Sequence, residues 1–191
     1  MRTKIAIFAS GAGSNADNLL TRFKKGEQHS PEIVCIISNK PDAGVLDVAA
    51  RHGVEARVFN KKAISEDEGL SGYLDEKGVQ GVVLAGFLLM IPGWLLDKYP
   101  NKVLNIHPAL LPKFGGKGMY GMHVHEAVKA AGETHTGITI HLCNHEYDKG
   151  PILLQAHCSV APTDSPKDIA HKIHALEYRY LPVVVESLFS E

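Results

Sequence analysis

An amide and an imidazole two residues apart, Asn105 and His107, have the clearest capacity for chemistry in this sequence. Val103 and Leu104 are apolar, and Pro108 disfavours helical dihedrals at the preceding histidine, so the segment is predicted to stay extended. Side chains two apart on a strand share a face. An amide N–H and a protonated imidazole could together stabilise an oxyanion and move a proton. The alternative is a histidine that only makes a structural hydrogen bond.

A glycine-rich turn, residues 10–15 (SGAGSN), connects the first apolar run to the first helical pattern. Free backbone N–H groups and the dipole at the start of a helix favour an anion, and phosphate is the natural occupant. The third glycine of a dinucleotide-binding fingerprint is missing, and no Lys-Ser or Lys-Thr pair completes a P-loop. The turn therefore favours a phosphorylated small molecule over NAD or ATP. The alternative is a glycine turn that only lets a strand meet a helix.

Two further segments are candidates for binding. Residues 85–92 (AGFLLMIP) leave a predicted strand and could wall an apolar pocket, or could simply pack under helices. A cluster of potential metal ligands comprises His141, Cys143, His145 and Asp148, but its spacing matches no structural zinc site, so no metal is expected. Asp148, which precedes Lys-Gly, could be a turn former, and it gains chemical importance only if it reaches His107.

Composition limits the classes of partner. The chain has 191 residues and a formal charge of −1, which provides no basic field for a nucleic-acid backbone, so no nucleic acid is expected. No apolar stretch is long enough to span a bilayer, so no membrane is expected either. Three cysteines without a signal peptide before them indicate a reducing compartment, and the cytoplasm is the expected location. These residues predict no particular oligomeric state.

The elements that must position these side chains alternate between β-prone and helical patterns, which is typical of βαβ units. The sequence predicts parallel strands over 4–9, 32–38, 56–59, 81–85 and 102–106, with helices over 15–25, 44–51, 65–76 and 93–99. Residues 107–122 are rich in glycine and proline and are predicted to form an active-site loop.

A helix over 123–131, antiparallel strands over 134–142 and 151–157, and a last helix from the Ser165 capping box to residue 188 complete the pattern. Pro182 should kink or divide that last helix. The predicted fold is a single α/β domain over residues 1–191. It is Rossmann-like, with a mainly parallel sheet of about seven strands, the last ones antiparallel, and helices on both faces. Ligands should gather at the carboxyl ends of the strands.

Together these segments resemble the folate-dependent phosphoribosylglycinamide formyltransferases of purine synthesis. The resemblance covers nearly the whole chain. It is carried by residues 5–15, 83–87, 104–116, 136–141 and 147–155, and by Glu177. The run Asn-x-His-Pro-x-Leu-Leu-Pro with a later Asp-x-Gly is specific to transferases and hydrolases that use formyltetrahydrofolate. The glycine turn followed by Ser14 and Asn15, and the short chain, favour the ribonucleotide enzyme within that group.

The resemblance implies a formyltransferase fold, and transfer of the formyl group of 10-formyltetrahydrofolate to the amine of phosphoribosylglycinamide. It implies that Asn105, His107 and Asp148 are catalytic, with Asp148 favouring the charged imidazole. It also implies two binding sets, which are Gly13, Ser14, Asn15 and Glu177 for the ribonucleotide's phosphate and its ribose or glycinamide part, and Leu88, Leu89, Met90, Ile91 and Asn105 for folate. The alternatives are a formyltetrahydrofolate hydrolase, a phosphometabolite-binding module without catalysis, and a metallohydrolase built on the His141 cluster.

Two features depart from many members of this family. Residues 88–91 read Leu-Leu-Met-Ile, where relatives carry an arginine, so a charged contact with folate is expected to be missing. Residues 117–121 (KGMYG) lengthen the loop relative to the shortest relatives, which could alter how the site closes over substrate.

Overall fold

The computed structural model describes residues 2–23 and 30–190. It contains one seven-stranded sheet with strand order β3-β2-β1-β4-β5-β6-β7. The first five strands are mutually parallel, whereas β6 pairs antiparallel with both β5 and β7. The strand bounds are β1 Lys4–Phe8, β2 Glu32–Ser38, β3 Glu55–Val58, β4 Gly81–Leu84, β5 Val103–His107, β6 His135–Leu142 and β7 Ile152–Ser159. The predicted mixed sheet is confirmed, including its antiparallel end.

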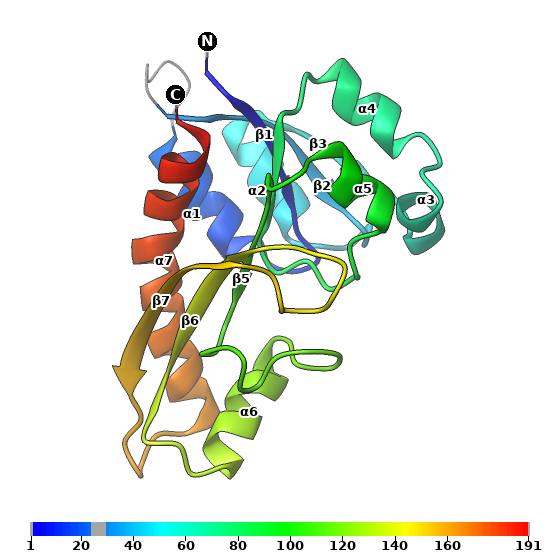
Figure 1. Cartoon of the computed structure of the whole chain (residues 1–191). Coiled ribbons are helices and arrows are strands. Elements are labelled where there is room, and N and C mark those ends of the chain that lie inside the picture. The colour runs from blue at the N-terminus through cyan, green and yellow to red at the C-terminus, as the bar shows by residue number, and fades with distance from the viewer. Residues whose placement is uncertain (1, 24–29, 191) are drawn as a thin grey trace.

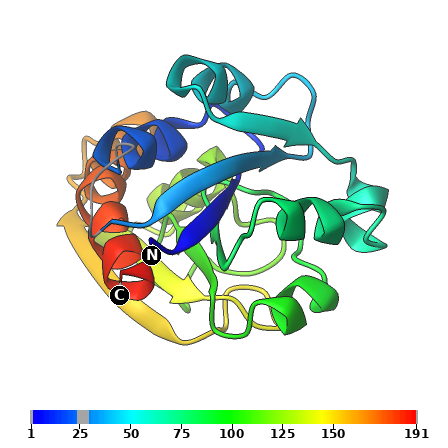
Figure 2. The ribbon, with the colours of Figure 1, turned by 90° about the horizontal axis from the view of Figure 1, so that it is seen from above.

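Helices cover both faces of this sheet (Figures 1 and 2). Their bounds are α1 Ser14–Arg22, α2 Val45–His52, α3 Lys61–Ser65, α4 Leu70–Glu76, α5 Gly93–Lys98, α6 Met122–Ala130 and α7 Pro166–Phe189. Apolar side chains of α1, α2, α6 and α7 share one buried core, and those of α3, α4 and α5 share a second. Strand β1 serves both cores, because Ile5 and Ile7 point to the first and Ala6 and Phe8 to the second.

The single helix predicted over 65–76 is wrong, because the structure divides this segment into α3 and α4. Asp67 and Gly69 take positive φ angles of 55° and 86°, which no α-helix contains. The Asp67 carboxylate also accepts the backbone N–H of Ser71, at the start of α4. A left-handed break and a local cap therefore replace a helix turn that the apolar spacing had favoured.

Pro182 was predicted to kink or divide the last helix, and it does not divide it, since α7 continues through it to Phe189. Pro182 has no N–H, so the carbonyl of Tyr178, four residues earlier, loses its helical donor. The side-chain amide of Asn18 on α1 donates to that carbonyl at 2.9 Å. A neighbouring helix therefore supplies the missing hydrogen bond. The start of α7 is as predicted, with the Ser165 capping box in place.

The first helix ends at Arg22, with Phe23 as its C-cap, so it is shorter than predicted. Residues 24 and 25 of the prediction lie outside the described residues.

No helix in the described ranges is long and apolar enough to cross a membrane.

Candidate active site

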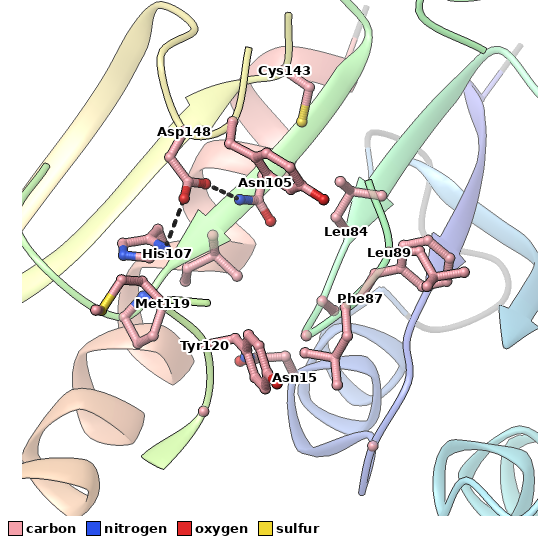
Figure 3. Close-up of a pocket in the computed structure, with 18 of the residues that line it drawn as sticks. Asn15, Leu84, Phe87, Leu89, Asn105, His107, Met119, Tyr120, Cys143 and Asp148 are labelled. Atoms are coloured by element: carbon pink, nitrogen blue, oxygen red, sulfur yellow. Dashed lines mark hydrogen bonds and ion pairs between the residues drawn. The ribbon is translucent and has the colours of Figure 1, made fainter. Parts of the chain in front are cut away.

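A cavity of about 580 Å³ opens at the carboxyl ends of β1, β4 and β5. The ends of these strands and the turns that follow them line it with residues 11–15, 85–91 and 105–108, and residues 116–121, 143, 144 and 146–148 complete its walls. Figure 3 shows Asn105, His107 and Asp148 together on one side and Phe87 and Leu89 on the other. Every predicted site residue lines this cavity. The sheet edge chosen from the sequence is therefore the one at which the cavity forms.

The side chain of Asn105 is oriented by two acceptors. Its Nδ2 lies 3.1 Å from Nε2 of His141 and 3.5 Å from Oδ1 of Asp148. The other ring nitrogen of His141, Nδ1, donates to the carbonyl of Leu142 at 3.0 Å, so in the neutral ring Nε2 carries the lone pair. A lone pair and a carboxylate both require a donor, and this fixes the amide with its N–H groups toward them.

The imidazole of His107 is held in a similar way. Its Nε2 lies 2.7 Å from the carbonyl of Phe114, which can only accept, so Nε2 carries the proton. Its Nδ1 lies 3.7 Å from Oδ2 of Asp148, too far for a direct hydrogen bond. Burial lowers the pKa of His107 below its usual 6.5, and the nearby Asp148 charge offsets this only in part. The resting imidazole is therefore neutral at pH 7, with the Nδ1 lone pair toward Asp148.

Asp148 joins these groups from the loop after β6. It takes a positive φ of 53°, and its Oδ2 accepts the backbone N–H of Gly116 at 2.9 Å. Burial alone would raise the pKa of this carboxyl, but the contacts with His141, Gly116 and His107 together hold its pKa below the usual range. Asp148 is thus an ionised carboxylate between two histidines. It meets the condition set from the sequence, that it reach His107.

The glycine turn leads directly into α1. Gly13 is the N-cap, with φ of 81°, and a Cβ atom there would lie 2.7 Å from Val45 Cα. Both the backbone angle and the space therefore require glycine. Ser14 and Asn15 follow as the first residues of the helix, where backbone N–H groups have no partner within the helix.

Asn15 forms a hydrogen bond with the last helix. Its Nδ2 donates to Oε2 of Glu177 at 3.0 Å, and both side chains are buried. Burial raises the pKa of Glu177, although the hydrogen bond from Asn15 opposes the rise. The phosphate-loop residues and Glu177, 162 positions apart, therefore form one polar wall.

The segment 88–91 forms the opposite wall. Leu88 and Met90 are 40% and 49% exposed, whereas Ile91 is buried. The hydroxyl of Ser10 accepts the backbone N–H of Leu88 at 2.9 Å, which ties this segment to the end of β1. Exposed apolar side chains beside a cavity suit a flat, partly apolar ligand.

The four residues of the suspected metal cluster do not converge. His141 and Asp148 are 3.6 Å apart, but His145 lies on the exposed side of its loop, 3.9 Å from Asp97. Across residues 2–23 and 30–190 no three His, Cys, Asp or Glu side chains are arranged to hold a metal ion. Burial raises the pKa of Cys143 to about 12, so its thiol is protonated.

Several cavity residues had no assigned role in the sequence analysis. His141 was considered only as a metal ligand, yet it orients Asn105. His125, His174 and Tyr120 also line the cavity, and Figure 3 places Tyr120 beside Asn15. A pattern of alternating residues on β6 placed His141 on a strand, but only the pairing of β6 with β5 brings it opposite Asn105. No local signal indicates His174 or Tyr120.

Comparison with known proteins agrees with this geometry. A family model described as formyl transferase matches residues 3–185. The chloroplastic phosphoribosylglycinamide formyltransferase of Arabidopsis thaliana is 39% identical over 195 residues, which cover all of this chain and 66% of that protein, just under two thirds. The phosphoribosylglycinamide formyltransferase of Haemophilus influenzae is 33% identical over 96% of this chain and 85% of its own length.

Solved structures give the same result. The crystal structure of phosphoribosylglycinamide formyltransferase from Anaplasma phagocytophilum superimposes with a TM-score of 0.88 at 32% identity, covering 97% of this chain and 86% of that one. The fold, the matched family model and these similarities over nearly the whole of this chain agree. The chain belongs to the formyl transferase family, and within it to the phosphoribosylglycinamide formyltransferases.

Proposed function

We propose that this chain transfers the formyl group of 10-formyltetrahydrofolate to the amine of phosphoribosylglycinamide, a step of purine biosynthesis. The observation that carries the proposal is the meeting of Asn105, His107 and Asp148 in one cavity with the Gly13–Asn15 turn. The first three side chains supply proton transfer and oxyanion stabilisation, and the turn supplies an anion site. Family membership supports the same reaction.

The proton path begins at His107. Because Phe114 holds the proton on Nε2, the Nδ1 lone pair is free to accept a proton from the attacking glycinamide amine. The imidazolium that forms then pairs with Asp148, whose Oδ2 lies 3.7 Å away. The same proton can be donated to the departing folate nitrogen, which restores the neutral ring.

Asn105 would stabilise the oxyanion formed when the amine attacks the formyl carbon. One of its N–H groups is held by His141, and the other has only a long contact of 3.5 Å with Asp148. A contact of that length is weak, so this second N–H can turn to a nearby oxyanion at little cost. The reaction requires no nucleophilic side chain and no metal.

The two substrates would occupy opposite walls. Gly13, Ser14 and Asn15 would hold the phosphate, and Glu177 would contact the ribose or glycinamide part. Leu88, Leu89, Met90 and Ile91, with Asn105, would line the folate site, where backbone groups and apolar contact replace the arginine that relatives carry. The 117–121 loop contains Lys117, the one Lys or Arg that lines the cavity within the described residues.

The location, domain organisation and partner classes of the protein remain predictions. All three cysteines are free in the structure, which accords with the expected cytoplasm, although the Arabidopsis relative is named as chloroplastic. One domain over residues 1–191 and the lack of a nucleic-acid or membrane partner also remain predictions.

The absorbance change on loss of the formyl group from 10-formyltetrahydrofolate tests the proposal. Release that requires phosphoribosylglycinamide, with the formylated product found by mass spectrometry, is the expected result. Release without the ribonucleotide would mean hydrolysis instead, and binding of both ligands without product would mean a non-catalytic binding module.

A further inference from the structure

His125 is a buried polar side chain that the reaction described above does not use. It is the fourth residue of α6, it is 3% exposed, and it lines the same cavity as Asn15 and Glu177. Burial, together with the charges that His174 and His107 can carry, lowers the pKa of His125 to about 4. The ring is therefore neutral at pH 7, with one N–H donor and one acceptor.

The hydrogen-bonding capacity of this ring is unused. Four buried side-chain polar atoms in the described part of the chain have no partner, and two of them, His125 Nδ1 and Asn15 Oδ1, belong to residues that line this cavity. Leaving a buried polar atom unpaired is unfavourable, and an unpaired N–H is rarer than an unpaired acceptor. The proton is therefore favoured on Nε2. This nitrogen makes no hydrogen bond within the described residues and is not among the fully buried unpartnered atoms, so it keeps some exposure, on a residue that lines the cavity, and is available as a donor.

The position of His125 selects the part of the ligand it would meet. The helix N-terminus at Gly13–Asn15 is the proposed phosphate site, and His107 marks the reacting amine. His125 lines the same cavity as both of these sites, and it is near enough to His107 for the charge of one ring to affect the other. The sugar of a phosphoribosyl compound joins its phosphate to its reacting amine, and would lie along the stretch of cavity between the turn and His107.

We propose that His125 is a substrate-binding residue, whose Nε2–H donates to an oxygen of the ribose of the ribonucleotide. This inference rests on the proposed function, because the ribonucleotide is the ligand. This contact accounts for a histidine at a buried position, where an apolar side chain would leave no polar atom unpaired. The contact places the sugar, and the transferred proton passes elsewhere, through His107.

Calorimetric binding of phosphoribosylglycinamide to the wild type and two variants tests this assignment. Phe in His125→Phe keeps a planar ring without nitrogens, and Gln in His125→Gln restores an N–H donor near the position of Nε2. The Kd of the ribonucleotide should rise about tenfold in His125→Phe, the scale of one lost hydrogen bond, and should recover in large part in His125→Gln. The KM for 10-formyltetrahydrofolate should not change. Thermal denaturation confirms that each variant is folded.

Two controls separate the possible outcomes. His123→Phe, on the same helix, changes an exposed histidine outside the cavity and keeps its ring contact with Tyr120, so binding should be unaffected. Inorganic phosphate, as a competitor, probes the Gly13–Asn15 turn alone, and its inhibition constant should be the same in every variant. An equal weakening of phosphate and ribonucleotide would move the contact to the phosphate and overturn the assignment to the sugar.

A ribonucleotide Kd that His125→Phe leaves unchanged would overturn the inference alone. The same holds if a folded His125→Gln binds no better than His125→Phe. Failure of the wild type to bind the ribonucleotide would overturn the proposed function and this inference with it.

Discussion

The two polar ends of the cavity differ in how far the protein satisfies its own hydrogen-bonding groups. At the end with Asn105, His107 and Asp148, each side chain is oriented by contacts within the chain, from His141, Phe114 and Gly116. At the other end, Asn15 and His125 each leave one buried atom without a partner. The first end is built to hold reacting groups in place before substrate arrives. The second is left incomplete, and a ligand would complete it.

This difference has an energetic meaning. An unpaired buried atom such as Asn15 Oδ1 costs about 1–3 kcal/mol, and a ligand that pairs with it recovers this as binding free energy. The contacts that orient side chains at the reacting end form when the protein folds, before substrate binds. They therefore contribute to the reaction rate and not to the binding free energy. Substitutions at the two ends should therefore change different kinetic constants.

The largest effect is expected for Asp148→Asn. It keeps an acceptor for Gly116 but removes the charge that stabilises protonated His107, so kcat should fall on the order of 10²-fold or more. Steady-state kinetics measures this, with Glu146→Gln, an exposed cavity carboxylate of the same loop, as the control that should keep wild-type turnover. Turnover of Asp148→Asn within a few fold of wild type would show that the pairing with His107 does not serve catalysis.

A smaller fall in kcat is expected for His141→Phe. Without the Nε2 lone pair the Asn105 amide loses its main acceptor, and kcat should fall about tenfold with little change in either KM. Glutamine at this position can offer an acceptor again, so His141→Gln should recover part of the loss. A change confined to KM would contradict the role of His141 as a positioning residue.

Glu177→Gln should act mainly on binding and stability. The KM for the ribonucleotide should rise about tenfold, because the acceptor that remains is uncharged. Burial raises the folded-state pKa of Glu177 above 4.5. The contribution of the protonated carboxyl to stability is therefore fully present below pH 4.5 and is lost as the pH rises through the folded-state pKa. At pH 7 the variant should therefore melt about 2–4 °C higher than wild type.

Thermal denaturation at two pH values checks the direction of this change in melting temperature. The gain in melting temperature of Glu177→Gln should vanish below pH 4.5, where the wild-type carboxyl is protonated in both the folded and unfolded states. A variant that melts lower than wild type at pH 7 would show that the buried carboxylate is compensated within the protein, and that this end is not incomplete.

The smallest expected effect is on the pH profile. Because burial lowers the pKa of His107, kcat/KM should fall on the acid side through a value below 6.5, as Nδ1 becomes protonated before substrate binds. Asp148 opposes this lowering, so Asp148→Asn should move the acid limb further down. A limb that moves up in the variant would mean that another group titrates there.

Much of the fold was predictable because its signals are local. Alternation of apolar residues placed strands such as β1, β4 and β5 within one or two residues, and Ser165 with its capping box marked the start of α7. The wrong predictions were those in which the structure overrode a local rule. Left-handed Asp67 and Gly69 ended a helix that apolar spacing had continued, and the Asn18 amide supplied the donor that Pro182 lacks.

The candidate site divides in the same way. Side chains at strand ends, such as Asn105 and His107, could be assigned from the sequence, since the carboxyl ends of parallel strands meet at one edge. The roles of His141 and His125 could not. Each depends on a contact, or on a missing contact, between segments far apart in the chain, such as Asn105 with His141 across the β5–β6 pairing.

By itself, the sequence determined which elements form, at which edge of the sheet the chemistry lies, and which residue types are available there, because periodicity, capping and turn residues act over a few positions. Only the tertiary structure decided the tautomers of His107 and His141, the depressed pKa of Asp148 and the unpaired atoms of Asn15 and His125. Burial and hydrogen-bond partners set these properties, and both arise only when distant segments pack together.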